Sequence, residues 1–337
     1  MTSQQFSPTS TLFSSNGLNN NQDNLNELEY HMMKSTIPYT SLLCLICLVI
    51  LGPGCATVPK GLVEGGPVMN SPHIPEPVPY RIYTPPGWDN QKPLPLVIYL
   101  HQEDGHCTDL ETGGVVQYLF GLISSKQIRP FILAAPESRG YWYDYHDGTR
   151  KYASFIMDDF IPQLRQEHAI IPGAMGVHIL GAGLGGQAAV ELSIHYPDKF
   201  RTAGAIGSYM FDEVSVSRYV ETQLFKGLDK ILGPSDDFNA MAAHNVMTGI
   251  QSREDIGKVR YVLGMGAFAE WDIAETNELF RQHLQRLYIP HDWVHFHGST
   301  KWASRRNIVP IFISLQLGFR KNQGNVNGMP YQVLKFR

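Results

Sequence analysis

The chain has 337 residues, of which 43% are hydrophobic, and its formal net charge is −4. This length and composition are enough for one large domain with a full core behind a leader segment. The weak net charge and the absence of a long basic run argue against nucleic acid as a partner.

The first 31 residues differ in composition from the rest of the chain. They are rich in Asn, Gln and Ser and contain neither Lys nor Arg. A segment with so little apolar surface cannot offset the entropy lost on ordering. We therefore expect residues 1–31 to be disordered, or not translated at all if the chain starts at Met32 or Met33.

An apolar run from Leu42 to Leu51 follows Lys34 and is itself followed by small residues. This order is typical of a secretory signal, and the run is shorter than the roughly 20 residues of a membrane-spanning helix. The end of the run, Leu-Gly-Pro-Gly-Cys55-Ala, resembles a bacterial lipobox with Gly52 at the usual leucine position. We expect residues 32–55 to be a signal peptide and Cys55 to carry a lipid anchor. The protein would then be exported and held on the periplasmic side of a membrane or at the cell surface. An ordinary cleaved signal or an uncleaved anchor is the alternative.

The segments that flank the main domain are predicted from composition. Residues 56–79 are rich in Pro and Gly and are expected to form a tether. Residues 320–337 are expected to be a polar tail, which leaves 80–319 as the domain. Cys44 and Cys47 lie in the leader, so a lipidated Cys55 would leave Cys107 without a disulfide partner.

Short apolar runs predict an edge strand at 80–83 and further strands at 94–100, 131–135, 177–180, 202–206, 259–263 and 291–297. Helical spacing of apolar residues predicts helices at 152–164, 184–197, 279–287 and 308–315. Alternating strands and helices indicate an α/β fold, with a mostly parallel central sheet covered by helices on both faces. Residues 208–255 are less regular and are expected to form an inserted cap or lid.

The strand at 177–180 runs into a glycine turn and then a helix. This is the layout of a nucleophile elbow, in which Gly-x-Ser-x-Gly exposes a catalytic serine. Here the pattern reads Gly-Ala-Gly183-Leu-Gly, so glycine stands at the serine position, and no other Gly-x-Ser-x-Gly occurs in the chain. Ser208 and Cys107 are the less favoured candidates for a displaced nucleophile.

Several segments in combination resemble the esterase D family of the α/β-hydrolase superfamily. The segment 96–101 (Leu-Val-Ile-Tyr-Leu-His) is similar to the strand before the oxyanion loop. The segments 135–145, Tyr152 and 160–162 are similar to the substrate-side loop and its helix. Gly185-Gly186 and 196–200 (Tyr-Pro-Asp-Lys-Phe) are similar to the elbow helix and its exit.

The resemblance covers residues 80–319 and implies an α/β-hydrolase fold. Feruloyl esterases, other carboxylesterases and mycolyltransferases belong to this family. Their chemistry needs a serine nucleophile, a histidine base, an acid that orients the histidine, and donors for the oxyanion.

The resemblance places the histidine in a Gly-x-His-x-Trp setting, which here reads Gly298-Ser-Thr300-Lys-Trp302. Threonine cannot act as a base near neutral pH, and the alternative base is His297 after a register shift. The acid falls on Asp272, and Glu270 is the alternative. Either carboxylate is also explained as a helix N-cap.

The oxyanion loop of the family reads Leu-His-Gly, whereas this chain has Leu100-His101-Gln102. The second oxyanion donor, the backbone N–H of Leu184, is expected to be retained. The residual cleft is expected to be lined by His101, Gln102, Trp142, Tyr143, Gly183, Leu184 and Thr300.

No cofactor is expected. The histidines at 101 and 106, with Glu103, Asp104 and Asp109, form one conceivable metal cluster. The histidines at 291, 295 and 297 share one face of a strand and form another. Neither spacing matches a strong ligand pattern, so solvated or core histidines are the favoured interpretation.

Three hypotheses follow. The first is a lipid-anchored protein with an esterase-like fold that has lost its serine hydrolase triad and binds a small acyl or ester ligand or a protein partner. The second is an active carboxylesterase or acyltransferase with an unconventional nucleophile or base. The third is a metal-dependent enzyme built on one of the histidine clusters.

Overall fold

The computed structural model describes residues 62–221, 227–251, 258–266, 271–296, 323–326 and 329–336. Contacts divide the chain into two units, 1–57 and 58–337, and all described residues belong to the second. The predicted extension, signal peptide and lipidated Cys55 lie outside these ranges. Within them, no helix combines the length and the hydropathy needed to cross a bilayer.

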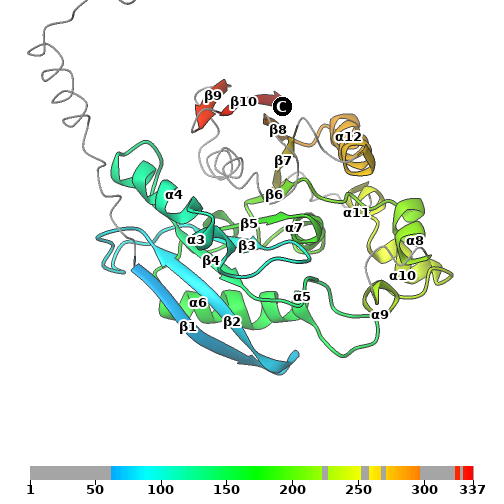
Figure 1. Cartoon of the computed structure of the whole chain (residues 1–337), viewed down its shortest axis with the longest axis horizontal. Helices are drawn as coiled ribbons and strands as arrows, with labels where there is room; N and C mark the ends of the chain where they lie inside the picture. Colours follow the sequence, from blue (N-terminus) through cyan, green and yellow to red (C-terminus); the bar gives the residue numbers. More distant parts are fainter. Residues whose placement is uncertain are drawn as a thin grey trace, which may run out of the picture. The chain divides into compact units, whose positions relative to one another are not determined.

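The described strands form a ten-stranded sheet in the order β1-β2-β4-β3-β5-β6-β7-β8-β10-β9 (Figure 1). The central six, from β4 to β8, are parallel, and an antiparallel pair flanks them on each side. The parallel strands are β3 (Leu96–Leu100), β4 (Ile132–Pro136), β5 (Val177–Ala182), β6 (Thr202–Ile206), β7 (Arg260–Gly266) and β8 (His291–Phe296). Each strand that the apolar runs predicted is present.

Side chains of the central strands alternate between two hydrophobic cores. In β3, Leu96 and Ile98 face the larger core, whereas Val97 and Tyr99 face the smaller one. Because successive side chains of a strand point to opposite faces, a strand apolar at every position must be covered on both sides. The structure confirms the α/β fold with helices on both faces of a mostly parallel sheet.

Two helices that the sequence did not predict pack on the smaller core. They are α3 (Asp109–Thr112) and α4 (Val115–Ser124), which bury Leu110, Val115 and Leu119 there. The helix predicted at 152–164 is present, but its middle is π-helical. It consists of α5 (Tyr152–Ser154), η1 (Phe155–Phe160) and α6 (Ile161–Glu167).

The larger core is covered by the helical segment 152–167, the elbow helix, the inserted segment and a late helix. The inserted segment is helical, and its helix α11 lies against α7. These elements are α7 (Leu184–His195), α8 (Glu213–Glu221), α9 (Leu228–Leu232), α10 (Phe238–Ala243), α11 (Val246–Gln251) and α12 (Trp271–Arg286). The predicted helix at 308–315 lies outside the described residues.

The predicted tether at 56–79 is wrong from Leu62 onward. Residues 62–84 form a hairpin of β1 (Leu62–Ser71) and β2 (Ile74–Thr84), which joins the sheet beside β4. The prolines of β2 are exposed while Ile74, Val78 and Tyr80 are buried. Of the residues of β2, only 80–83 pair with β4, so the prolines before them need not donate to a second neighbour, as is typical of edge positions.

The predicted polar tail at 320–337 is also wrong. It contains β9 (Gln323–Val326) and β10 (Met329–Phe336), and β10 pairs with β8 from Tyr331↔Phe296 to Phe336↔His291. The apolar stretch of β10 is short and follows a run of polar residues, so composition alone predicted a tail. The strand is completed by a neighbour more than 30 residues away.

Candidate functional site

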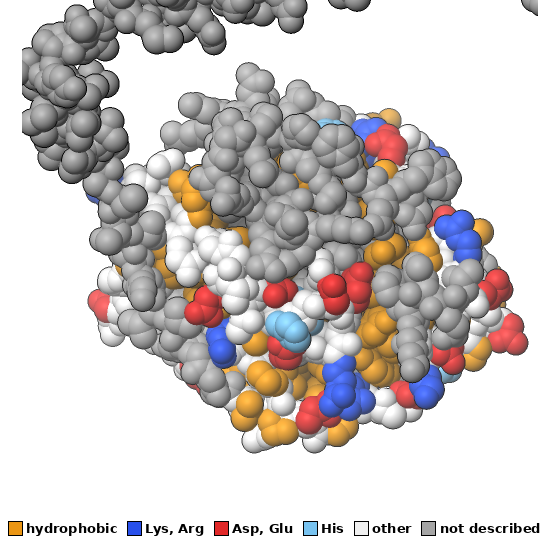
Figure 2. All heavy atoms as spheres, viewed as in Figure 1, with side chains coloured by type: hydrophobic (Ala, Val, Ile, Leu, Met, Phe, Trp, Pro, Cys, Tyr) orange, Lys and Arg blue, Asp and Glu red, His pale blue; other side chains and the backbone are white. Residues whose placement is uncertain are grey.

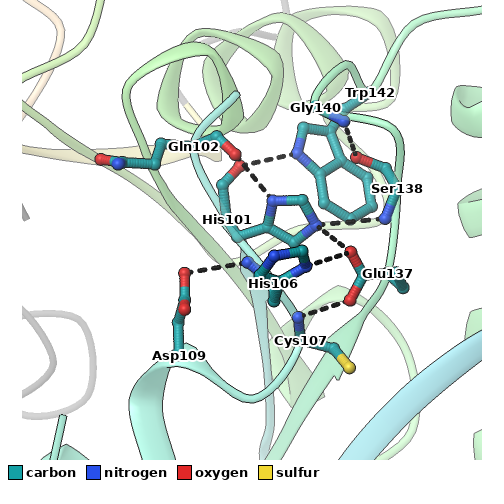
Figure 3. A network of polar contacts seen from close by, with 9 residues as sticks. All are labelled: His101, Gln102, His106, Cys107, Asp109, Glu137, Ser138, Gly140 and Trp142. Carbon is teal, nitrogen blue, oxygen red and sulfur yellow. Dashed lines mark hydrogen bonds and ion pairs between the residues drawn. The ribbon is translucent and has the colours of Figure 1, made fainter. Parts of the chain in front are cut away.

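The ends of β3, β4 and β5 lie at the same edge of the sheet, because parallel strands end together. Three segments therefore meet there: the loop 101–108 after β3, the loop 137–151 after β4, and the glycine turn after β5 (Figure 3 shows the first two). In open parallel sheets this edge is the usual place for a ligand site.

The turn between β5 and α7 keeps the geometry of a strained elbow. Gly183 has φ 54° and ψ −127°, a region that side chains adopt only under strain. A Cβ at Gly185 would collide with the carbonyl oxygens of Leu100 and His101, and one at Gly186 would collide with the Ser208 hydroxyl. These glycines therefore let α7 pack directly against the neighbouring strand ends.

The carboxylate of Glu103 lies against this turn. Its Oε2 accepts a hydrogen bond from the backbone N–H of Leu184 at 3.2 Å. A Cβ built on Gly183 would lie 2.6 Å from the same oxygen. The Leu184 N–H, the expected oxyanion donor, thus already binds a carboxylate oxygen from the same chain. The sequence counted Glu103 only as part of a polar cluster, since no local pattern places it near residue 184.

His101 is fully buried beneath the loop and serves a structural role. Its Nδ1 lies 2.7 Å from the carbonyl oxygen of Gln102, and its Nε2 accepts from the N–H of Ser138 at 3.1 Å. The indole N–H of Trp142 donates to the His101 carbonyl oxygen at 2.9 Å (Figure 3). These partners assign the neutral imidazole with its proton on Nδ1. Burial lowers the pKa of His101, which also favours the neutral form.

Glu137 ties the loops after β3 and β4 together. Its Oε2 accepts from the backbone N–H of Cys107 at 2.8 Å, and its Oε1 lies 3.2 Å from His106 Nδ1 and 3.5 Å from His101 Nε2 (Figure 3). Glu137 also lines a cavity of about 170 Å³ between β2 and the loop after β4.

The two candidates for a displaced nucleophile, Cys107 and Ser208, lie in environments that do not activate them. Burial raises the pKa of the Cys107 thiol to about 12, so the thiol is protonated at neutral pH and is a poor nucleophile. Ser208 is fully buried, and its hydroxyl donates to the carbonyl oxygen of Ile206 at 3.2 Å. Neither environment activates a nucleophile, because burial and the Glu137 carboxylate keep the Cys107 thiol protonated and the Ser208 hydroxyl is paired with a carbonyl oxygen.

The structure corrects the predicted cleft. Trp142 and Tyr143 are 0% and 3% exposed, so they belong to the core and do not line an open surface. His101, Gly183 and Leu184 are buried as well, and Gln102 is half-buried. Both aromatic side chains pack in the hydrophobic core, and the indole hydrogen bond to the His101 carbonyl oxygen also holds Trp142 there.

The remaining predicted residues are not brought into this site by the described structure. Asp272 is the second residue of α12, so the helix starts where it was predicted, but Asp272 lies inside the helix and is not its N-cap. Glu270, His297 and Thr300 lie outside the described residues. His291 is buried with its Nδ1 near the Ile289 carbonyl oxygen, whereas His295 is exposed and accepts from the Trp293 indole. Among the described residues, no group of three or more His, Cys, Asp or Glu has the arrangement of a metal site.

Several solved structures with similar folds are esterases and related hydrolases. A ferulic acid esterase superposes with a TM-score of 0.65 at 16% identity, over 77% of this chain and 100% of the other. FphF of Staphylococcus aureus, a fluorophosphonate-binding serine hydrolase, has a TM-score of 0.62 at 14% identity, over 76% and 98%. An S-formylglutathione hydrolase from Agrobacterium tumefaciens has the same TM-score and identity, over 76% and 94%.

The fold, the strained turn after β5 and these similarities agree with a match in sequence. Residues 71–306 match the family described as "Esterase: Putative esterase". That range covers more than half of the chain and includes β3–β8 with the helices between them. The chain therefore belongs to this esterase family and has its α/β-hydrolase fold.

Proposed function

We propose that this chain is a member of the esterase family that does not hydrolyse esters by serine chemistry and works through binding, either of a small acyl or ester ligand or of a protein partner. One observation carries the proposal: the residue at the apex of the elbow is Gly183, which has no side chain that could attack a carbonyl. The fold around it is intact, so the turn retains a role in folding. Thr300 at the expected histidine position supports the same conclusion from sequence.

The size of the expected defect follows from the chemistry. The nucleophile and base of a serine hydrolase act as a unit, and losing either one removes roughly 10⁶ in kcat in the best-studied case. What remains is the weak contribution of binding and of oxyanion donors. Here the Leu184 donor is itself occupied by Glu103, which supports a still smaller residual rate.

Short-chain ester hydrolysis tests the proposal directly. We expect the purified protein to show no turnover above that of a heat-unfolded sample, with or without added Zn²⁺, while a ferulic acid esterase assayed in parallel turns over normally. Turnover that is lost on substituting one Ser or Cys would support the active-esterase hypothesis instead. Turnover that requires Zn²⁺ would support the metal-dependent one.

We further propose export and lipid anchoring at Cys55. The short apolar run, the small residues after it and the cysteine support this proposal. In a Gram-negative host, the wild-type protein is expected to partition into the detergent phase on Triton X-114 separation, and Cys55→Ser into the aqueous phase. The control Cys107→Ser changes a buried thiol and should stay in the detergent phase. Detergent partitioning of Cys55→Ser would contradict the anchor.

A further inference from the structure

We propose that the Glu103 carboxylate fills the position at the elbow where the acyl oxygen of an ester would otherwise bind. By filling this position, Glu103 determines which ligands the site rejects. This inference deepens the proposed function and rests on it for the absence of a nucleophile at residue 183. It predicts that an acyl ligand cannot use the elbow while Glu103 is in place, so any acyl or ester ligand of this protein binds outside the elbow.

The first support is the position of the Glu103 carboxylate. It accepts the Leu184 N–H at 3.2 Å, and its Oε2 lies 2.6 Å from the place where a Cβ of residue 183 would be. The Glu103 carboxylate therefore binds the N–H that would bind an oxyanion, and it also fills the space into which a nucleophilic side chain at residue 183 would project. A site built to stabilise developing negative charge needs free donors, and here the Leu184 N–H is already paired with a carboxylate oxygen of the same chain.

The second support is that close packing and hydrogen bonds fix the backbone on both sides of Glu103. Gly140 has φ 94° and packs on the Glu103 carbonyl group so closely that a Cβ at residue 140 would collide with it. The Gly105 N–H donates to the Gln102 carbonyl oxygen at 3.0 Å and closes a tight turn around Glu103. Glu137 then fixes the next residues through the Cys107 N–H. The loop is tied on both sides of Glu103, so the carboxylate has a defined place.

The third support is the charge felt by a neighbouring aromatic side chain. Burial and, after it, the negative charge of Glu103 raise the pKa of Tyr141 to about 12. The Glu103 carboxylate therefore adds to burial in disfavouring a second negative charge beside it, such as an oxyanion or a free carboxylate.

A cysteine at residue 183 makes the occupancy measurable without any catalytic machinery. We would compare the rate of iodoacetamide alkylation at residue 183 in full-chain Gly183→Cys and in Gly183→Cys/Glu103→Ala, by mass spectrometry of the peptide that carries it. The thiolate is the reactive form, and a nearby carboxylate raises the thiol pKa while also blocking access. Removing Glu103 is expected to speed alkylation about 10-fold or more, the effect of roughly one pKa unit. Gly183→Cys/Glu103→Gln, which removes the charge and keeps the bulk, should give an intermediate rate.

Asp104 supplies the matched control. It is the next residue, is exposed, and accepts from the Gln102 side chain. Gly183→Cys/Asp104→Asn should alkylate within about twofold of Gly183→Cys, because an exposed charge in water acts weakly. Equal rates in Gly183→Cys and Gly183→Cys/Glu103→Ala would overturn the proposal.

A second measurement avoids position 183 in case its cysteine variants do not fold. In the wild-type background, Glu103→Ala removes the acceptor of the Leu184 N–H, so hydrogen exchange of that amide is expected to become about 10-fold faster or more, and added formate should slow it again by filling the vacated space. Unchanged exchange in Glu103→Ala would overturn the inference. Ester turnover by the wild-type protein would instead refute the proposed function and leave these rates as they are.

Discussion

Replacing Gly186 by alanine is expected to destabilise the protein by about 2–3 kcal/mol. Helix propensity alone predicts the opposite, since alanine in a helix interior is favoured over glycine by about 1 kcal/mol. The steric effect wins because a Cβ at Gly186 would collide with the Ser208 hydroxyl and lie 2.8 Å from the Gly181 carbonyl oxygen. Chemical denaturation followed by circular dichroism measures the change.

Two variants show whether the collision is the cause. Adding Ser208→Gly to Gly186→Ala removes the hydroxyl and the Cβ that it meets, and is expected to recover about 1 kcal/mol or more relative to the sum of the single changes. Gly249→Ala in α11 is the matched control, because its Cβ would meet only the side chain of Ile194 at 3.2 Å. A Gly186→Ala protein as stable as the Gly249→Ala protein would contradict the close packing of α7 on β6.

Acidification is expected to destabilise the fold through His178, by about 3 kcal/mol between pH 7 and pH 4. This side chain of β5 is 6% exposed, and among the described residues its Nδ1 has no hydrogen-bond partner. Burial, followed by the charges of Arg201 and Arg260, lowers the pKa of His178 from 6.5 to about 4. The stated energy corresponds to that shift at 1.36 kcal/mol per pKa unit.

The sign follows from proton binding. The folded pKa of His178 lies below the unfolded value, so between pH 6.5 and 4 the unfolded chain binds a proton that the folded chain does not. Stability is therefore full above pH 6.5 and falls as the pH drops towards 4. The glutamine in His178→Gln cannot titrate. The free energy of unfolding of this variant should therefore differ from that of the wild-type protein by a constant above pH 7, and the variant should lose less stability than the wild-type protein below pH 6. Parallel curves for the two proteins from pH 7 to 4 would contradict this assignment.

The central part of the fold could be predicted from the sequence because its signals are local. A strand such as β3 is apolar at every position, and burial on both faces is the reason. The elbow could be found because Gly183 and Gly185 are close in sequence to the strand and helix they join. The same locality explains why the predicted bounds of the parallel strands agree with the structure to within a few residues.

The edges of the sheet could not be predicted in this way. The strand β2 carries prolines on its exposed face, and proline in a short segment is equally typical of a tether. The strand β10 is specified by its pairing with β8 rather than by its own composition. Sequence patterns indicate local conformational preference, whereas an edge strand also depends on the strand with which it pairs.

The candidate site was only partly predictable, for a related reason. Glu103 and Leu184 are 81 residues apart, and only the folded chain brings the carboxylate to the amide. The resemblance of residues 135–145 to the substrate-side loop of the esterase D family predicts Trp142 and Tyr143 in a cleft, yet both are buried. Burial of a loop side chain depends on the packing of several segments, which spacing along one of them does not reveal.

We propose that the elbow of this esterase-family protein is a structural turn without a nucleophile. The most direct measurement is the intact mass of the folded protein after incubation with a fluorophosphonate probe, with an active serine hydrolase labelled in parallel. The mass of this protein should stay unchanged while the active enzyme gains one adduct. A single adduct, mapped to one serine and abolished when the protein is first unfolded, would contradict the claim.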